Sequence, residues 1–271
     1  MSAARARRGR TKRDGLGAWV DEVAVLHAKA SRALRVEVVH DLRVAIRRCR
    51  SLAQGLRQVD ADDGAARWKA LSDAGRALFQ GLGDLRDAQV MKEHASRALA
   101  NAPCAAAVDA AIEARIAAVK VSARAAVAGF DVDAWRAAAD GLPERAHALL
   151  VERALFDHLA LRRFHEVKEL HQQAMRSKAS TSLHELRIGV KKLRYTLENF
   201  LPDAHAAVGK VLKRAQDLLG DVHDLDVLVA TLSSEHVRLH SDDRSRTATV
   251  VRADRDRLVQ EYRALALGND G

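Results

Sequence analysis

The chain contains an internal repeat, and this repeat constrains its fold more than any other feature. The segment EVAVLHAKASR at 22–32 aligns with EVKELHQQAMR at 166–176 at an offset of 144 residues. The same offset aligns HDLRVAIRRCR at 40–50 with HELRIGVKKLR at 184–194. An offset of 137 then aligns LGDLRDAQV at 82–90 with LGDVHDLDV at 219–227. Because the three segments keep their order in both copies, the sequence predicts a tandem duplication.

The composition predicts an all-α protein. Hydrophobic residues make up 48% of the chain, but aromatic residues only 4%, and there are three prolines. This profile, rich in alanine, favours helices over sheets. From the apolar periodicity we expect helices near 18–35, 37–58, 64–82, 86–100, 104–129, 144–177 (one helix or two), 182–200, 203–219, 223–238 and 244–266.

Each copy of the repeat contains one strongly basic helix. Residues three and four positions apart share a helix face, so the histidine and the basic residues form a stripe opposite an apolar face. The stripe positions are His40, Arg43, Arg47 and Arg50 in the first copy and His184, Arg187, Lys191 and Arg194 in the second. The few acidic residues lie mainly near the helix starts and do not interleave with the stripe. Ten residues of helix rise about 15 Å, so each stripe suits an extended anion better than a single phosphate.

Several other features favour structural roles. In the two Leu-Gly-Asp-x-x-Asp segments we expect Gly83 and Gly220 to end one helix in the left-handed conformation. Asp84 and Asp221 would then cap the next helix, with Asp87 and Asp224 in its first turn. Ser182 and Glu185 fit a capping box. We expect His27 and His171 to be packed and hydrogen-bonded and Cys49 to lie in the core. Cys49 and Cys104 lack metal-ligand spacing, and no metal or cofactor is predicted.

The charge distribution separates the start of the chain from the rest. The net charge is +9, of which residues 1–17 contribute +5. These residues lack apolar periodicity, and we expect a disordered basic tail. The longest apolar runs are far shorter than the roughly 20 residues that cross a bilayer, and the N-terminus has no signal-peptide core. The sequence therefore predicts a cytoplasmic location and no membrane partner.

The doubled His-x-x-Arg-x-x-x-(Arg/Lys)-(Arg/Lys)-x-Arg pattern resembles the CHAD domain, the conserved-histidine α-helical domain. The Leu-Gly-Asp-x-x-Asp segments and the LRY sequence at 193–195 are also similar to that family, and the resemblance runs from about residue 18 to 266. It implies two antiparallel helical bundles related by a pseudo-two-fold axis, at 18–140 and 141–267, with a basic channel between them. Ser51 stands where the second copy has Tyr195, so any phenolic contact would be one-sided.

The resemblance also implies a ligand and a set of binding residues. The ligand is inorganic polyphosphate, bound without catalysis, and a location on polyphosphate granules would fit. The stripe residues would bind it, with Arg48 and Lys192 as flanking contacts and Arg76 and Lys213, which coincide at the 137 offset, contributing from neighbouring helices.

Two alternative functions remain open at this point. A nucleic-acid binder is compatible with basic helices, although the few aromatic residues do not interleave with the arginines as stacking platforms would. A histidine-dependent phosphoanhydride hydrolase is the other alternative, although neither a carboxylate cluster nor a glycine-rich phosphate loop supports it. The oligomeric state is not predicted.

Overall fold

The chain is all-α in the residues that the structure, a computed structural model, describes. These are residues 15–60, 64–99, 105–150, 153–177, 179–232 and 241–268, which form twelve helices and no strand. The helices pack into two compact units, each assembled from two stretches of the chain. Unit 1 comprises the described residues up to Phe79 together with 127–150, and unit 2 comprises 80–126 and those from 153 onward.

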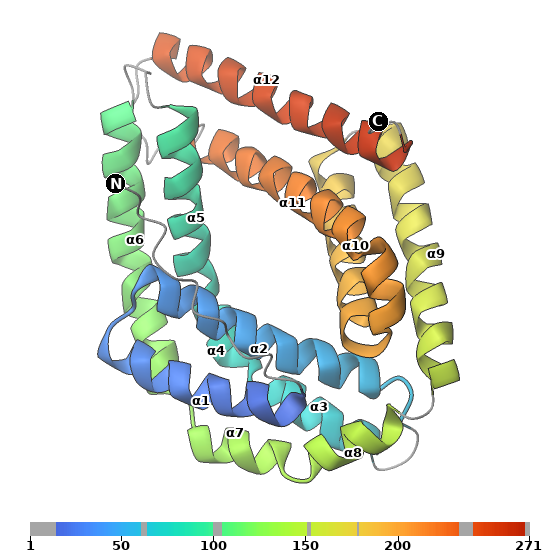
Figure 1. Ribbon diagram of the computed structural model, residues 1–271. Coiled ribbons are helices and arrows are strands. Elements are labelled where there is room, and N and C mark those ends of the chain that lie inside the picture. Colours follow the sequence, from blue (N-terminus) through green and yellow to red (C-terminus); the bar gives the residue numbers. More distant parts are fainter. Residues whose placement is uncertain are drawn as a thin grey trace, which may run out of the picture. The chain divides into compact units, whose positions relative to one another are not determined.

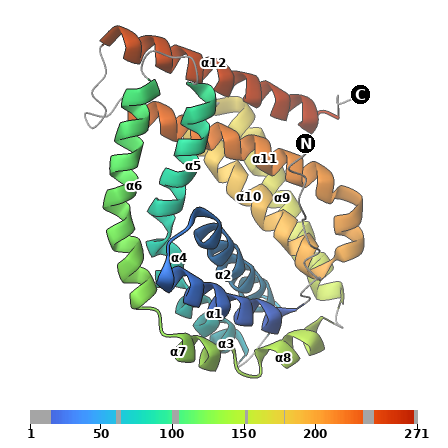
Figure 2. The ribbon, with the colours of Figure 1, turned by 60° about the vertical axis from the view of Figure 1, so that its left-hand side comes forward.

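Unit 1 contains the first basic helix. Its helices are α1 (Leu16–Arg32), α2 (Val36–Leu56), α3 (Gly64–Ala74), the first turn of α4 (Arg76–Gly81), α7 (Val132–Ala139) and α8 (Leu142–Leu149). Helix α2 packs against α1 and α3, α7 packs against α3 and α1, and α8 packs against α1. Figure 2 shows α1 and α2 side by side.

The core of unit 1 is built around two tryptophans that are fully buried. Trp135 Nε1 donates a hydrogen bond of 3.2 Å to the carbonyl of Val20. Trp68 Nε1 donates to Asp60 Oδ2 at 2.5 Å, and Arg145 donates to both carboxylate oxygens of Asp60 at 2.6 Å. This buried carboxylate therefore connects the segment after α2 to α3 and α8.

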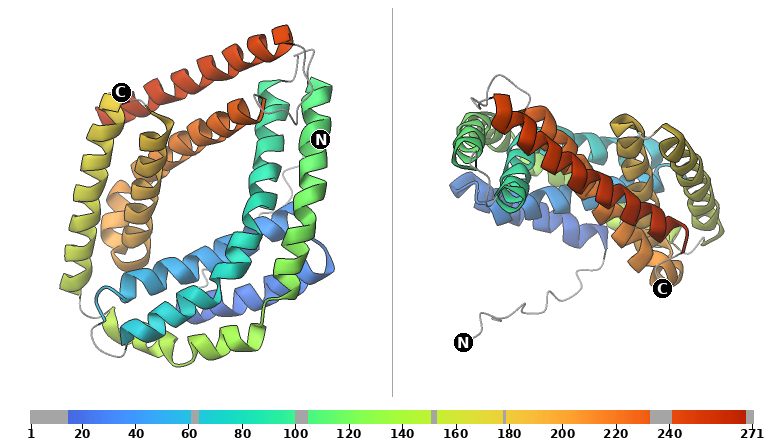
Figure 3. Two further views of the ribbon diagram at one scale, coloured as in Figure 1. Left: turned by 180° about the vertical axis from the view of Figure 1, so that it is seen from behind. Right: turned by 90° about the horizontal axis from the view of Figure 1, so that it is seen from above.

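Unit 2 contains the second basic helix. Its helices are α5 (Gly83–Ala98), most of α6 (Ala105–Ala128), α9 (Arg153–Ser177), α10 (Ser180–Phe200), α11 (Pro202–Leu232) and α12 (Ser241–Ala266). Helix α10 packs between α9 and α11, and α11 also packs against α12 and α5 (Figure 1). Figure 3 shows α5 and α6 side by side. Gly189 allows the close approach of α9, since a Cβ there would lie 2.7 Å from Leu170 Cδ1.

Most of the predicted helices are present, and a helix break lies at the first Leu-Gly-Asp-x-x-Asp segment, but the turn predicted at the second segment is wrong. Helix α11 runs without a break through the second Leu-Gly-Asp-x-x-Asp segment, and neither Gly83 nor Gly220 has a positive φ. Leu219, Val222 and Leu225 are buried, and their burial outweighs the cost of about 1 kcal/mol for a glycine inside a helix.

The expected caps are also corrected. In the first copy a single residue, Leu82, separates α4 from α5, and Asp84 lies in the first turn of α5 rather than at its cap. The capping box does not form, because α10 begins at Ser180 and Ser182 lies inside it. Ser182 accepts a hydrogen bond of 2.9 Å from the Ser177 hydroxyl.

The structural roles predicted for the repeated histidines and for Cys49 are confirmed. His27 is half-buried, with Nε2 2.8 Å from the carbonyl oxygen of Val127. His171 Nδ1 lies 3.0 Å from the Tyr262 hydroxyl oxygen. Cys49 is fully buried, and burial raises the pKa of its thiol. Most of the expected basic tail, residues 1–14, lies outside the described residues, and so does Cys104.

Candidate anion-binding sites

The basic stripe of α2 lies opposite its buried face, as the spacing predicted. Leu42, Ile46 and Cys49 are fully buried in unit 1. On the other face, His40 is exposed and Arg43, Arg47 and Arg50 are half-buried. The half-burial follows from packing, because the Nε atoms of all three arginines are buried.

The three stripe arginines gather over one aromatic ring, that of Phe79 in α4. The guanidinium carbons of Arg43, Arg50 and Arg47 lie 4.3, 5.3 and 5.9 Å from the ring centroid. Arg43 Nη1 also donates a hydrogen bond of 2.6 Å to the Phe79 carbonyl. The electron-rich face of the ring attracts cations and partly offsets the repulsion among the three charges. Phe79 was missed in the sequence because it is 29 residues from the stripe.

Arg76 extends this cluster from the start of α4. Burial first, and then the positive charge of Arg76, lower the pKa of Arg50, while Asp73 opposes this shift. Arg76 Nη2 donates to Asp73 Oδ1 at 2.6 Å, and the same carboxylate pairs with Lys69. Arg76 thus adds a fourth cation close to Arg50 of the stripe.

Arg48 lies apart from this cluster. Its guanidinium carbon is 4.6 Å from the ring centroid of Trp19 on α1. It therefore belongs to the α1 side of α2.

The basic stripe of α10 has more carboxylate and amide partners. Arg194 donates to Gln216 Oε1 of α11 and to Glu198 Oε2, both at 3.0 Å, and its guanidinium carbon lies 4.6 Å from the centroid of the Tyr195 ring. Lys213 on α11 pairs with Asp217 of its own helix. The side chains of Arg187 and Lys191 are half-buried.

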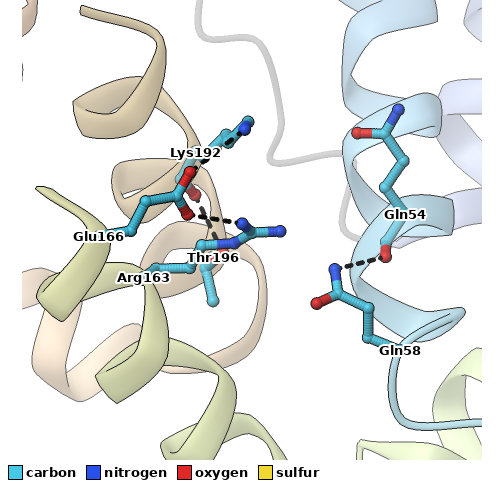
Figure 4. A network of polar contacts seen from close by, with 6 residues as sticks. All are labelled: Gln54, Gln58, Arg163, Glu166, Lys192 and Thr196. Carbon is cyan, nitrogen blue, oxygen red and sulfur yellow. Dashed lines mark hydrogen bonds and ion pairs between the residues drawn. The ribbon is translucent and has the colours of Figure 1, made fainter. Parts of the chain in front are cut away.

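Lys192 belongs to a separate network. Its ammonium group lies 3.4 Å from Glu166 Oε1 on α9, and Arg163 donates to the other oxygen of this carboxylate at 2.7 Å (Figure 4). Thr196 donates to the carbonyl of Lys192 at 2.9 Å within α10. The network ties α10 to α9, so Lys192 also has a structural role.

A histidine pair lies at the beginning of the α10 stripe. His184 Nδ1 is 3.3 Å from Nδ1 of His223 on α11, and the ring centroids are 4.7 Å apart. Gly220 lies one turn before His223 and faces Arg187 of the stripe, since a Cβ at Gly220 would lie 3.9 Å from Arg187 Nε. Burial, followed by the charges of Arg187 and His184, lowers the pKa of His223. The expected helix break at Gly220 concealed His223 from the sequence analysis.

A second polar cluster lies where α5 packs against α11. His94 Nε2 is 3.1 Å from Asp224 Oδ2 and 3.9 Å from Asp221 Oδ1. Burial raises the pKa of Asp221, and the nearby charge of His94 opposes that shift. Among the residues that the structure describes, these three form the one group of histidine, cysteine and carboxylate ligands close enough to hold a metal ion.

The structure brings together one group of the predicted residues within each unit. Unit 1 gathers Arg43, Arg47, Arg50 and Arg76, with His40 and Arg48 at the margins. Unit 2 places His184, Arg187, Lys191 and Arg194 along one helix, with Lys192 and Lys213 in neighbouring ion pairs. The stripe in each group lies on one regular helix, α2 or α10, which fixes the order of its charges.

An all-α chain with two copies of a helix bearing a histidine and basic residues defines a narrow class of protein. The model of the CHAD domain matches residues 16–233, and the chain belongs to this family. A crystal structure of the CHAD domain from the plant Ricinus communis has a similar fold, with a TM-score of 0.67 and 21% sequence identity over 93% of this chain and 88% of that one. A search of curated proteins found no match.

Within its described residues, the chain has no helix that combines the length and the apolar character needed to cross a membrane.

Proposed function

We propose that the protein binds inorganic polyphosphate through the stripes of α2 and α10 and does not transform it. The observation that carries this proposal is the gathering of Arg43, Arg47 and Arg50 over the Phe79 ring, with Arg76 close to Arg50. Like charges held this close repel one another, and a bound polyanion removes that cost. Guanidinium groups also match phosphate oxygens with paired donors.

The spacing of the stripes favours a linear ligand. His40 and Arg50, like His184 and Arg194, are ten positions apart, which corresponds to about 15 Å of helix. A chain of phosphates lying along the helix would meet a cation at each turn. A single phosphate would use only one or two of these groups.

The use of the aromatic rings favours polyphosphate over nucleic acid. Phe79, Trp19 and Tyr195 each have an arginine guanidinium over the ring. A nucleic-acid base would have to displace that guanidinium in order to stack. Polyphosphate has no bases and needs only the cations. We extend the proposal to a location in the cytoplasm, on polyphosphate granules where these form.

A competition assay tests the ligand. Fluorescent long-chain polyphosphate is bound to the protein and displaced by unlabelled polyphosphate, single-stranded DNA or double-stranded DNA. We expect displacement by polyphosphate at concentrations at least tenfold lower, per phosphate, than by either DNA. Equal or better displacement by DNA would overturn the proposal in favour of a nucleic-acid binder.

Two further measurements test the site and the lack of turnover. Arg47→Ala and Lys191→Ala should weaken binding much more than Arg257→Ala, which removes an exposed cation of α12 that pairs with Glu261. Equal losses in all three variants would indicate diffuse attraction instead of a site. We expect no phosphate release from polyphosphate in the presence of Mg²⁺ or Mn²⁺. Release that disappears in a His184→Ala variant would revive the hydrolase alternative.

A further inference from the structure

The cluster of His94, Asp221 and Asp224 has the composition of a metal site. Asp221 and Asp224 lie one turn apart on α11 and share a face, and His94 meets them from α5. One ligand atom from each of the three side chains lies within 4.8 Å of the other two. The stripes of α2 and α10 do not include any of these residues.

The distances fit a metal ion after small side-chain rotations. Zinc binds histidine nitrogen and carboxylate oxygen at about 2.0–2.2 Å, which places neighbouring ligand atoms roughly 3.0–3.6 Å apart. The Nε2 atom of His94 is already 3.1 Å from Asp224 Oδ2 and 3.9 Å from Asp221 Oδ1. All three ligands come from regular helices, so the backbone need not move.

The cluster is half-open, which leaves room for water. The side chain of His94 is 11% exposed, that of Asp224 25% and that of Asp221 47%. The protein would therefore supply three ligands on the buried side and solvent the others, as in metal sites with an open coordination position.

The charges around the cluster leave it negative. Two carboxylates face one imidazole, and Asp217 adds a further negative charge near Asp221. Arg97 is the nearby cation, with Nη2 3.4 Å from His94 Nδ1. A divalent ion would neutralise both carboxylates.

We propose that His94, Asp221 and Asp224 bind one divalent first-row transition-metal ion, with Mn²⁺ and Zn²⁺ as the best candidates. One imidazole and two carboxylates suit these ions, whereas Ca²⁺ and Mg²⁺ prefer oxygen ligands alone. None of the three ligands belongs to the stripes, so this proposal does not rest on polyphosphate binding. The site ties α5 to α11, so the bound ion would also stabilise unit 2.

The test uses the full-length protein after treatment with a chelator. Titration with Mn²⁺ alone, followed by electron paramagnetic resonance, should show one bound ion per chain. The spectrum of the bound ion should carry nitrogen modulation from an imidazole. The His94→Gln variant should lose this modulation, and Asp221→Asn and Asp224→Asn should each weaken binding at least tenfold. The control Asp157→Asn, which removes an exposed carboxylate of α9, should leave binding unchanged.

Arg97→Ala provides a test that keeps all three ligands. Removal of the nearby cation should leave Mn²⁺ affinity equal or higher, and Mn²⁺ should raise the melting temperature of this variant as it does that of the wild type. The proposal is wrong if the wild type binds neither Mn²⁺ nor Zn²⁺ stoichiometrically. It is also wrong if the Asp221→Asn/Asp224→Asn double variant binds them as the wild type does.

Discussion

Replacing Phe79 tests whether its ring positions the α2 stripe for binding. Phe79→Leu keeps most of the apolar volume but removes the aromatic face below Arg43 and Arg50, at 4.3 and 5.3 Å, and Arg47, at 5.9 Å. A cation–π contact near the surface contributes about 0.5–1 kcal/mol, and two close contacts therefore contribute about 1–2 kcal/mol. The hydrogen bond from Arg43 goes to the backbone of Phe79 and survives the change.

The loss should appear as weaker binding of polyphosphate. Without the ring the guanidinium groups move apart, and binding must collect them again, so the full 1–2 kcal/mol raises Kd about 5–30-fold. Isothermal titration calorimetry measures this change, and circular dichroism verifies that the helices remain. Phe79→Tyr keeps the aromatic face and should bind as the wild type does. Wild-type affinity in Phe79→Leu, or an equal loss in both variants, would refute the reasoning.

Three further predictions concern salt, stability and pH. Affinity for polyphosphate should fall at least tenfold between 50 and 200 mM NaCl, because polyphosphate binding to each stripe displaces several counterions. Fluorescence titrations that give the same Kd at both salt concentrations would contradict this prediction. Arg145→Ala should lower the free energy of unfolding, measured in urea, by about 3 kcal/mol. The loss should exceed that in Asp60→Asn, because Arg145→Ala leaves the Asp60 carboxylate, whose side chain is 4% exposed, without its bidentate partner. The hydrogen bonds from Arg145 lower the pKa of Asp60 in the folded state below its ordinary 3.8. The stability contributed by this ion pair is therefore fully present above pH 3.8 and is lost as the pH falls through the lowered pKa of Asp60. Burial beside Arg187 and His184 holds the pKa of His223 below its ordinary 6.5, so this histidine gains its charge only at a pH below 6.5. Affinity for polyphosphate should therefore rise as the pH falls below 6.5, and His223→Ala should flatten that rise.

The regular part of the fold could be predicted from local patterns. The duplicated segments and the apolar periodicity indicated an all-α chain, and the 3–4 spacing placed Leu42 and Ile46 on the face of α2 opposite Arg43 and Arg47. These predictions succeed because the helix period directly determines which residues share a face.

The turns could not be predicted from the same patterns. Gly220 fits a helix end by residue type, but apolar residues before and after it keep one helical period and are buried, so α11 continues. Tertiary packing thus outweighs the local preference of glycine and aspartate. The error affected the candidate sites, because a continuous α11 directs His223 towards His184 and Asp224 towards His94.

The partners of the stripes also required the structure. Phe79, Gln216 and His223 lie 29, 22 and 39 residues from the stripe side chains that they contact. No spacing rule on a single helix connects residues so distant in sequence. The stripes themselves were local features, whereas the ring and the amide that hold their side chains depend on how the helices pack.

The central claim is that the stripes bind polyphosphate, and one calorimetric comparison tests it most directly. The wild type and the Arg43→Ala/Arg47→Ala/Arg50→Ala variant are each titrated with long polyphosphate of defined length at several salt concentrations. We predict tight binding by the wild type, loss of most long-chain affinity in the variant although the α10 stripe is intact, and a salt slope shallower by about 2–3. If the variant binds with the wild-type affinity but half the stoichiometry, the two stripes are independent sites. If the variant has both the affinity and the salt slope of the wild type, the claim that these arginines bind the polyanion is contradicted.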